Sequence, residues 1–189
     1  SRERTHTFSE EDLELVTALA SVAAAKIENA RLLEESLEKR RLEEDMRVAA
    51  EIQRSMLPKA SPTIEGSDVA AGTAPCRAVG GDYFDFHVTK DRLTFVLGDV
   101  SGKGTGAALI MTTLRAAVRD YWLEDELTQA LNEMNNLVAQ NVPANKYVTF
   151  FLGRLDLVTG HLEYVNAGHN APILSRASGH VDRLKTGGM

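Results

Sequence analysis

The chain has 189 residues, 43% of them hydrophobic, and its 27 acidic and 21 basic residues give a formal net charge of −6. This size allows one sizeable core, which excludes a disulfide-stapled miniprotein and a multidomain array. The negative balance excludes a global attraction to nucleic acid or to an anionic membrane, so neither is expected as a partner.

Features that the sequence lacks suggest where the protein resides. Its one cysteine, Cys76, cannot form an intrachain disulfide, and the first residues lack the apolar run of a signal peptide. No uncharged run approaches the roughly 20 residues needed to cross a bilayer. We therefore predict a cytoplasmic protein.

Residues 9–57 contain no glycine and no proline, which predicts one long helix. Ser9 and Asp12 have the spacing of a capping box, Phe8 and Leu13 have that of a hydrophobic staple, and Pro58 ends the pattern. A continuous helix of about 48 residues would extend roughly 72 Å at 1.5 Å per residue, far beyond a typical globular helix. Such a helix must bury its apolar side against something.

Apolar and small residues recur in this helix at spacings of three and four, which aligns them as one seam with a phase break near residues 38–41. The seam contains Leu13, Val16, Ala20, Ala23, Ile27, Ala30, Leu33 and Leu37 before the break, and Leu42, Met46, Ala49, Gln53 and Met56 after it. We predict a parallel coiled-coil dimer that transmits a signal from an upstream module, with two registers competing at the break. The alternative is two ordinary helices that pack on the following domain.

From residue 59 onward the pattern changes to short strands, glycine turns and amphipathic helices. Strands are predicted over 69–74, 92–100, 146–156, 162–166 and 172–175, and helices over 106–122 and 126–140. A turn at 158–161 joins two of these strands as a hairpin. This order of elements predicts an α+β layered domain rather than a doubly wound one.

Two aspartates occupy positions that are unusual for a purely structural role. Asp82 follows two glycines, and Asp99 ends an apolar strand just before another glycine-rich loop. Carboxylates at strand ends beside glycines are good ligands for hard cations, because backbone carbonyls and water can also approach the ion. The alternative is that each aspartate only caps a turn or a helix.

Four motifs, in this order, resemble those of the bacterial stage II sporulation E and stress-response sigma regulator phosphatases, a PP2C-like branch of the metal-dependent serine/threonine phosphatases. The motifs are AEIQRSMLP at 50–58, VGGDYFD at 79–85, GDVSGKG at 98–104 and NAGHN at 166–170. The resemblance covers roughly residues 47–189. In addition, residues 7–33 resemble the last helix of a GAF sensor domain.

The resemblance implies a PP2C-like α/β/β/α sandwich over 58–189, preceded over 1–57 by the end of a GAF-like sensor and a signalling helix. It makes Asp82, Asp99 and the Val100 carbonyl ligands of a two-metal Mn²⁺ or Mg²⁺ centre. A water activated by the metals would attack phosphoserine or phosphothreonine, so no protein nucleophile is needed.

Other polar residues near these motifs have less specific expectations. Ser101 and Cys76 are interpreted as structural, and His169 as a turn or packing residue rather than a general acid. Asp85 is left open between holding a metal-bound water and capping a turn.

The resemblance also implies partners and regulation. The substrate would be a STAS-type anti-sigma factor antagonist, and further metal-binding aspartates would lie beyond residue 189, so the C-terminal part of the domain is expected to be missing. Residues 47–57 are expected to pack on the domain through Val48, Ile52, Ser55 and Met56 and to gate metal binding at Asp82. The alternative is a catalytically incomplete dimerisation and signal-relay module.

Overall fold

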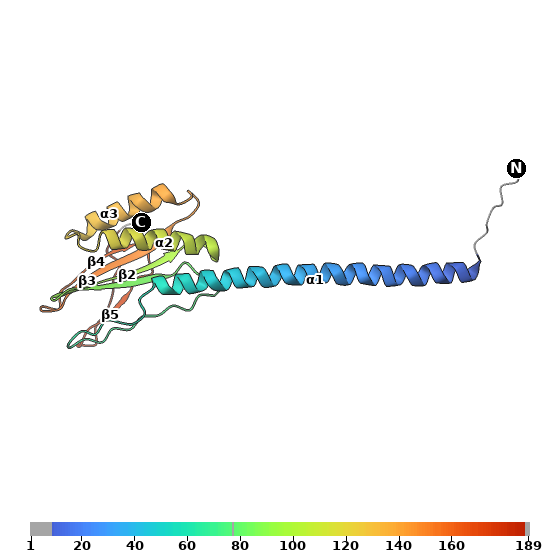
Figure 1. The fold of residues 1–189 in the computed structure, drawn as a ribbon. Helices are drawn as coiled ribbons and strands as arrows, with labels where there is room; N and C mark the ends of the chain where they lie inside the picture. Colours follow the sequence, from blue (N-terminus) through green and yellow to red (C-terminus); the bar gives the residue numbers. More distant parts are fainter. Residues whose placement is uncertain (1–8, 77, 188–189) are drawn as a thin grey trace. The chain divides into compact units, whose positions relative to one another are not determined.

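The computed structural model describes residues 9–76 and 78–187. It divides into two compact units, Ser1–Asp45 and Met46–Met189. Helix α1, Glu10–Met56, forms the described part of the first unit, and its last residues belong to the second. All other helices and strands of the described residues lie in the second unit (Figure 1).

The predicted long helix is confirmed, and it continues without interruption through the phase break at 38–41. Its start has the predicted capping box: the Ser9 N–H donates to Asp12 Oδ2 (2.9 Å), and the Asp12 N–H donates to Ser9 Oγ (3.2 Å). These hydrogen bonds lower the pKa of Asp12. The proposed staple partner, Phe8, lies outside the described residues. No helix in the described part of the chain is long and apolar enough to cross a membrane.

The second unit is built on a four-stranded antiparallel sheet with the strand order β1-β2-β3-β4. The strands are β1 Tyr83–Val88, β2 Arg92–Val100, β3 Val148–Asp156 and β4 Leu162–Ala167. A separate two-stranded sheet contains β5 Ile173–Ser175 and β6 Val181–Arg183. Helices α2 Thr105–Asp120 and α3 Leu127–Asn141 cover one face of the larger sheet (Figure 1). The predicted α+β class is therefore confirmed.

The core lies between that sheet face and the two helices, because alternate strand residues point toward the helices. Its main members are Tyr83, Val96, Val100, Ile110, Met111, Leu114, Val118, Leu127, Met134, Phe150 and Leu152. Burying each large side chain of this kind stabilises the fold by about 1.5–3 kcal/mol. The face that α2 and α3 cover is thus the rigid support of the sheet.

The opposite face of the sheet is rich in aromatic residues. The rings of Phe95 and Phe151 lie 6.1 Å apart, and those of Phe151 and Tyr164 stack at 5.6 Å. Gly153 lies under the Phe95 ring, where a Cβ atom would have no room. Position 153 needs glycine because the large Phe95 ring lies directly against the backbone there.

One predicted strand is absent and two observed strands were missed. Residues 69–74 form no strand, whereas Tyr83–Val88, for which no strand was predicted, forms β1. The aromatic residues of β1 bury one side against the core, while Gly72 interrupts the other segment, whose residues are largely exposed. Strand β6 was also missed. The other predicted elements are present with ends shifted by at most two residues.

Candidate functional site

The register of the sheet brings the two candidate aspartates together. Tyr83 of β1 pairs with Gly98 of β2, and Gly81 lies against the Val100 carbonyl, so a continued register would place Asp82 opposite Asp99. Opposite residues of an antiparallel pair share a face, with Cβ atoms about 4.5–5.5 Å apart. Both carboxylates therefore belong to the face opposite α2 and α3, and both side chains are exposed. Two side chains 17 positions apart in sequence can thus hold one metal ion, or two neighbouring metal ions, between them.

Gly81 allows the chain before Asp82 to approach the carbonyl of Val100, the residue after Asp99. A Cβ atom on Gly81 would lie 2.8 Å from the Val100 oxygen and 2.9 Å from the Val100 Cβ. Gly81 is buried, so a side chain there would have no free direction to occupy. The glycine before Asp82 therefore sets the distance between the loop at 79–82 and the end of β2.

The row of polar side chains continues onto the third strand. Asp99 pairs with Thr149 of β3, and Thr149 Oγ1 lies 3.0 Å from His169 Nδ1. Gly168, with φ +69°, forms a bridge to Phe150, which carries the chain after β4 back beside β3. One row of polar residues at this end of the strands thus contains Asp82, Asp99, Thr149 and His169.

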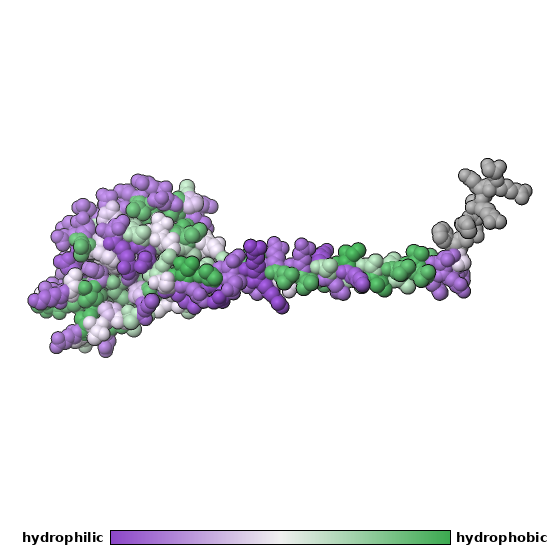
Figure 2. Space-filling model, viewed as in Figure 1, coloured by the Kyte–Doolittle hydropathy of each residue, from purple (hydrophilic) through white to green (hydrophobic). Residues whose placement is uncertain are grey.

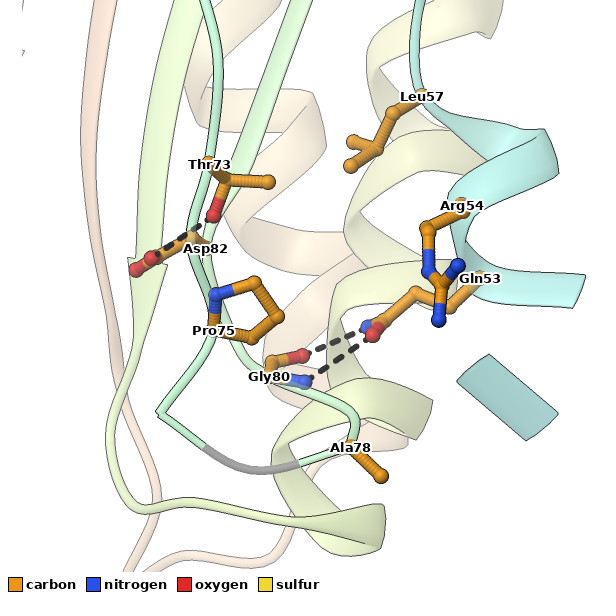
Figure 3. A pocket seen from close by; sticks show the side chains of 8 residues that line it. All are labelled: Gln53, Arg54, Leu57, Thr73, Pro75, Ala78, Gly80 and Asp82. Carbon is orange, nitrogen blue, oxygen red and sulfur yellow. Dashed lines mark hydrogen bonds between the residues drawn. The ribbon is translucent and has the colours of Figure 1, made fainter. Parts of the chain in front are cut away.

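The loop before Asp82 is held by the end of α1. The Gln53 side-chain amide donates to the Gly80 carbonyl (2.7 Å) and accepts from the Gly80 N–H (3.0 Å), as a paired strand would (Figure 3). On the other side of the loop, Thr73 Oγ1 donates to Asp82 Oδ2 at 3.2 Å (Figure 3). A small pocket separates these groups, lined by Gln53, Arg54, Leu57, Thr73, Pro75, Ala78, Gly80 and Asp82. The position of Asp82 therefore depends directly on that of Gln53.

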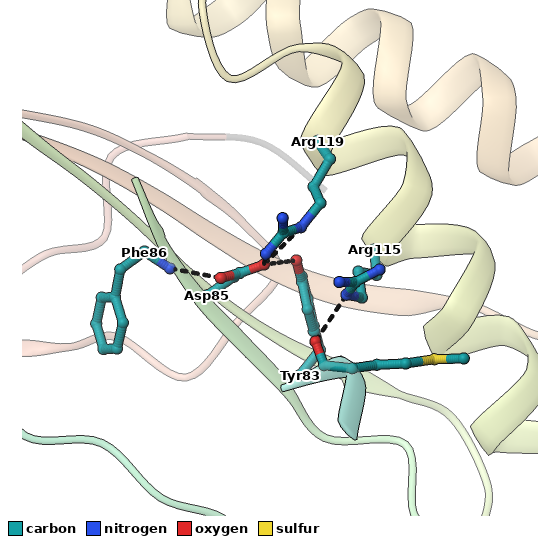
Figure 4. Close-up of polar contacts among 6 residues, drawn as sticks. Tyr83, Asp85, Phe86, Arg115 and Arg119 are labelled. Carbon is teal, nitrogen blue, oxygen red and sulfur yellow. Dashed lines mark hydrogen bonds and ion pairs between the residues drawn. The ribbon is translucent and has the colours of Figure 1, made fainter. Parts of the chain in front are cut away.

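The packing face of this helix end differs from the one expected. Of the four residues expected to pack, Met56 is half-buried, but Val48 and Ile52 are exposed by 43% and 53% and Ser55 is also exposed, whereas Ala50 is buried. The inward face instead carries Ala50 and Gln53 because it must approach the Gly80 loop closely. Arg115 of α2 adds a second anchor, since its Nε donates to the Met56 carbonyl at 2.7 Å (Figure 4).

Asp85 lies on the other face of the sheet, the one that α2 covers, and is only 1% exposed. Its Oδ2 accepts from the Tyr83 hydroxyl (2.9 Å) and from Arg119 Nη2 (3.0 Å), and its Oδ1 accepts from the Phe86 N–H (Figure 4). Burial and the neighbouring Asp85 carboxylate raise the pKa of Tyr83. Asp85 is thus neither a turn cap nor a neighbour of Asp82 and Asp99: it ties β1 to α2 through a buried charge.

The candidate ligands at this end of the strands are two carboxylates and one backbone carbonyl. Oxygen ligands of this kind suit a hard divalent cation. Among the described residues, no three His, Cys, Asp or Glu side chains gather in an arrangement that could hold a metal. An ion between Asp82 and Asp99 would therefore complete its shell with water or with phosphate oxygens, as Mg²⁺ commonly does.

The remaining candidate residues have clear surroundings. Ser101 Oγ accepts from the Tyr147 N–H (2.9 Å), which ties the loop after Asp99 to the segment before β3. Cys76 is exposed and free. Sequence reasoning missed the contacts made by Gln53 and Thr149, although Gln53 lies in the motif at 50–58 and Thr149 in a predicted strand. Their roles depend on contacts between distant segments, which no local pattern encodes.

Comparison with known proteins gives a consistent result. The model of the family described as stage II sporulation protein E matches residues 89–189. The phosphoserine phosphatase RsbU of Bacillus subtilis is 31% identical over 68% of the chain, which spans only 38% of that relative. The RsbU and RsbW domains of Rv1364c from Mycobacterium tuberculosis match 60% of the chain with 35% identity and a TM-score of 0.53, covering 32% of that structure.

A further solved structure supports the fold alone. The SiaA-PP2C domain of Pseudomonas aeruginosa superposes with a TM-score of 0.63 at 18% identity, over 79% of this chain and 62% of that one. The two helices on an antiparallel sheet thus have the fold of PP2C-type domains.

Proposed function

Because the chain belongs to the stage II sporulation protein E family, we propose that it is a metal-dependent protein phosphatase that hydrolyses phosphoserine or phosphothreonine on a partner protein. The observation that supports this proposal is the register of β1 and β2, which pairs Tyr83 with Gly98, the direct neighbours of Asp82 and Asp99. We also propose that residues 1–57 are the end of a GAF-like sensor and a signalling helix, and that 58–189 form the phosphatase domain. The cytoplasmic location remains a prediction.

In this proposal, Asp82, Asp99 and the Val100 carbonyl hold Mn²⁺ or Mg²⁺. When bound, such ions supply a water of lowered pKa and positive charge for the phosphoryl oxygens. The two carboxylates set the position of the phosphoryl group relative to the edge of the sheet. Gly81 and Gly80 keep the loop close to the end of β2, and no side chain of the protein forms a covalent intermediate.

The proposed substrate is a phosphorylated STAS-type anti-sigma factor antagonist, so that the output is release of a sigma factor. The support is the 31% identity to the phosphoserine phosphatase RsbU of Bacillus subtilis. A protein substrate also suits carboxylates that lie exposed at a sheet edge, where a flexible phosphorylated segment can reach them.

The test is release of inorganic phosphate from a phosphoserine STAS-type protein with and without Mn²⁺. The chain is assayed beside a version extended through the downstream Gly-Asp and Asp-Gly motifs that the resemblance implies. We expect release that depends on Mn²⁺. No turnover by either version, across several phosphoproteins, would favour the dimerisation and signal-relay module.

We propose that the end of α1 regulates the site through Gln53. Replacing Gln53 with alanine leaves the Gly80 N–H and carbonyl without their partner, and an unpaired half-buried backbone group costs about 1–3 kcal/mol. We expect phosphate release to fall about 10-fold, since 1.4 kcal/mol corresponds to a factor of ten. Gln53→Glu keeps the hydrogen-bond acceptor and loses the donor, so its rate of phosphate release should lie between those of Gln53→Ala and the wild type.

The matched control for this prediction is Ser55→Ala, because Ser55 hydrogen-bonds only within its own helix, to the Ile52 carbonyl. Steady-state phosphate release at several Mn²⁺ concentrations is the measurement. A Gln53→Ala variant with the activity and Mn²⁺ requirement of the Ser55→Ala variant would argue against regulation by this contact.

We propose that α1 pairs with α1 of a second copy. Apolar side chains gather along its N-terminal half (Figure 2), among them Leu13, Val16, Leu19, Val22 and Ile27, all more than half exposed. Sedimentation equilibrium should find a dimer. Ile27→Glu should shift it toward monomer, and the adjacent Lys26→Glu should not. A monomeric wild-type chain at micromolar concentration would contradict the pairing.

A further inference from the structure

Among residues 9–76 and 78–187, His169 is the one histidine whose side chain joins the row of polar groups beside the candidate metal ligands. It follows Asp82, Asp99 and Thr149 in the row of polar side chains at the edge of the sheet, through its 3.0 Å contact with Thr149 Oγ1. Asp99 and Thr149 are cross-strand neighbours, with Cβ atoms about 4.5–5.5 Å apart, so the ring that contacts Thr149 lies at the same end of the strands as Asp99.

The backbone of His169 is held in place from both sides. Its N–H donates to Asn166 Oδ1 (2.8 Å), and its carbonyl accepts from Asn166 Nδ2 (3.1 Å). Asn166 is itself only 5% exposed and also donates to the Leu184 carbonyl. The backbone that carries the His169 ring is therefore fixed before a substrate binds, which reduces the entropy lost on binding.

The contact with Thr149 also decides which ring nitrogen is available. In the described part of the chain, Thr149 is the one side chain that hydrogen-bonds the ring, and it engages Nδ1. When the threonine hydroxyl donates, the neutral ring carries its hydrogen on Nε2. When the ring is protonated, Nδ1–H donates to Thr149 and Nε2–H stays free. A neutral ring that donates through Nδ1 has a bare Nε2, so Nε2–H is available to a leaving oxygen as an acid in the protonated ring.

We propose that His169 is a catalytic residue that, in its protonated form, donates its Nε2 proton to the leaving seryl or threonyl oxygen and becomes neutral. This inference rests on the proposed function. As the bond from water oxygen to phosphorus forms, the bond from phosphorus to Oγ breaks, and the Nε2 proton moves to Oγ to give the free hydroxyl. A proton released by the attacking water restores the ring through solvent, so the products are the alcohol and hydrogen phosphate.

The proposal has a consequence that a structural role does not share. An alkoxide is a poor leaving group and needs a proton, whereas p-nitrophenolate leaves readily without one. His169→Gln should therefore slow release of phosphate from a phosphoserine STAS-type protein about 100-fold, in the range typical of a lost general acid. Hydrolysis of p-nitrophenyl phosphate by the same variant should change less than threefold.

Three further variants sharpen the comparison. Thr149→Val keeps the shape of the side chain but loses the hydroxyl, and should reduce turnover of phosphoserine selectively, whereas Thr149→Ser should retain it. His161→Gln, in the exposed turn between β3 and β4, is the matched control and should match wild type on both substrates. Inorganic phosphate added with Mg²⁺ should shift the ¹⁵N ring resonances of His169 and leave those of His161 unmoved.

The outcomes distinguish the general-acid role of His169 from the proposed phosphatase function. Equal losses of His169→Gln on both substrates, or an unmoved His169 resonance, would overturn the general-acid role while leaving a phosphatase. A wild-type protein that releases phosphate from neither substrate would refute the proposed function and the role of His169 with it.

Discussion

Asp99→Asn is expected to lower phosphate release about 1000-fold, because a metal stabilises transferring phosphoryl oxygens by several kcal/mol and each 1.36 kcal/mol is a factor of ten. Asparagine keeps the size of the side chain but removes the negative charge that attracts the cation. The Asp99 side chain is exposed and ends its strand, so the core around Val96 and Val100 stays intact. Phosphate release from a phosphoserine STAS-type protein, measured across a range of Mn²⁺ concentrations, checks the prediction.

The matched control for Asp99→Asn is Asp91→Asn, which removes an equal charge from the exposed turn between β1 and β2. It should keep wild-type activity. Both variants should unfold at the denaturant midpoint of the wild type, which separates loss of the site from loss of the fold. An Asp99→Asn variant with more than a tenth of wild-type turnover would show that Asp99 is not a metal ligand.

How far the sequence predicts this protein depends on whether the signal is local. Strand β2 was predicted with its observed ends, because Leu93, Phe95 and Val96 form an apolar run that stops at Gly98 and Asp99. Strand β1 was missed because Gly80 and Gly81 mark a loop, and the strand begins only two residues later. Its partner, β2, stabilises it through the antiparallel ladder, which is information that a local pattern lacks.

The same distinction between local and long-range signals applies to the candidate site. Asp82 and Asp99 could be chosen from their glycine neighbours and from the family motifs, but their approach to each other comes from a register that the sequence does not spell out. Likewise, the apolar residues near the end of α1 suggested the wrong inward face. A helix that must approach a backbone loop presents a small residue, Ala50, and an amide, Gln53, rather than its largest apolar side chains.

Gly81→Ala is the second substitution for which we expect a large loss, about 100-fold in phosphate release, because a misplacement of about 1 Å in a site can reduce the rate that much. The new methyl would lie 2.8 Å from the Val100 carbonyl oxygen, 2.9 Å from the Val100 Cβ and 3.2 Å from the Ala107 Cβ. Real Cβ atoms do not approach this closely, so either the loop that carries Asp82 or the end of β2 must move. Both movements separate the proposed ligands of one ion.

The measurement for Gly81→Ala is the Mn²⁺ concentration that gives half-maximal phosphate release, together with the maximal rate. Gly72→Ala is the control, since a Cβ atom there meets nothing within 4 Å and the residue lies in the same stretch of chain before β1. A raised Mn²⁺ requirement in Gly81→Ala alone would support a ligand set that depends on the distance between Asp82 and the Val100 carbonyl. If both variants match the wild type, the carbonyl is not a ligand, and the ion must be held by the carboxylates and by phosphate oxygens.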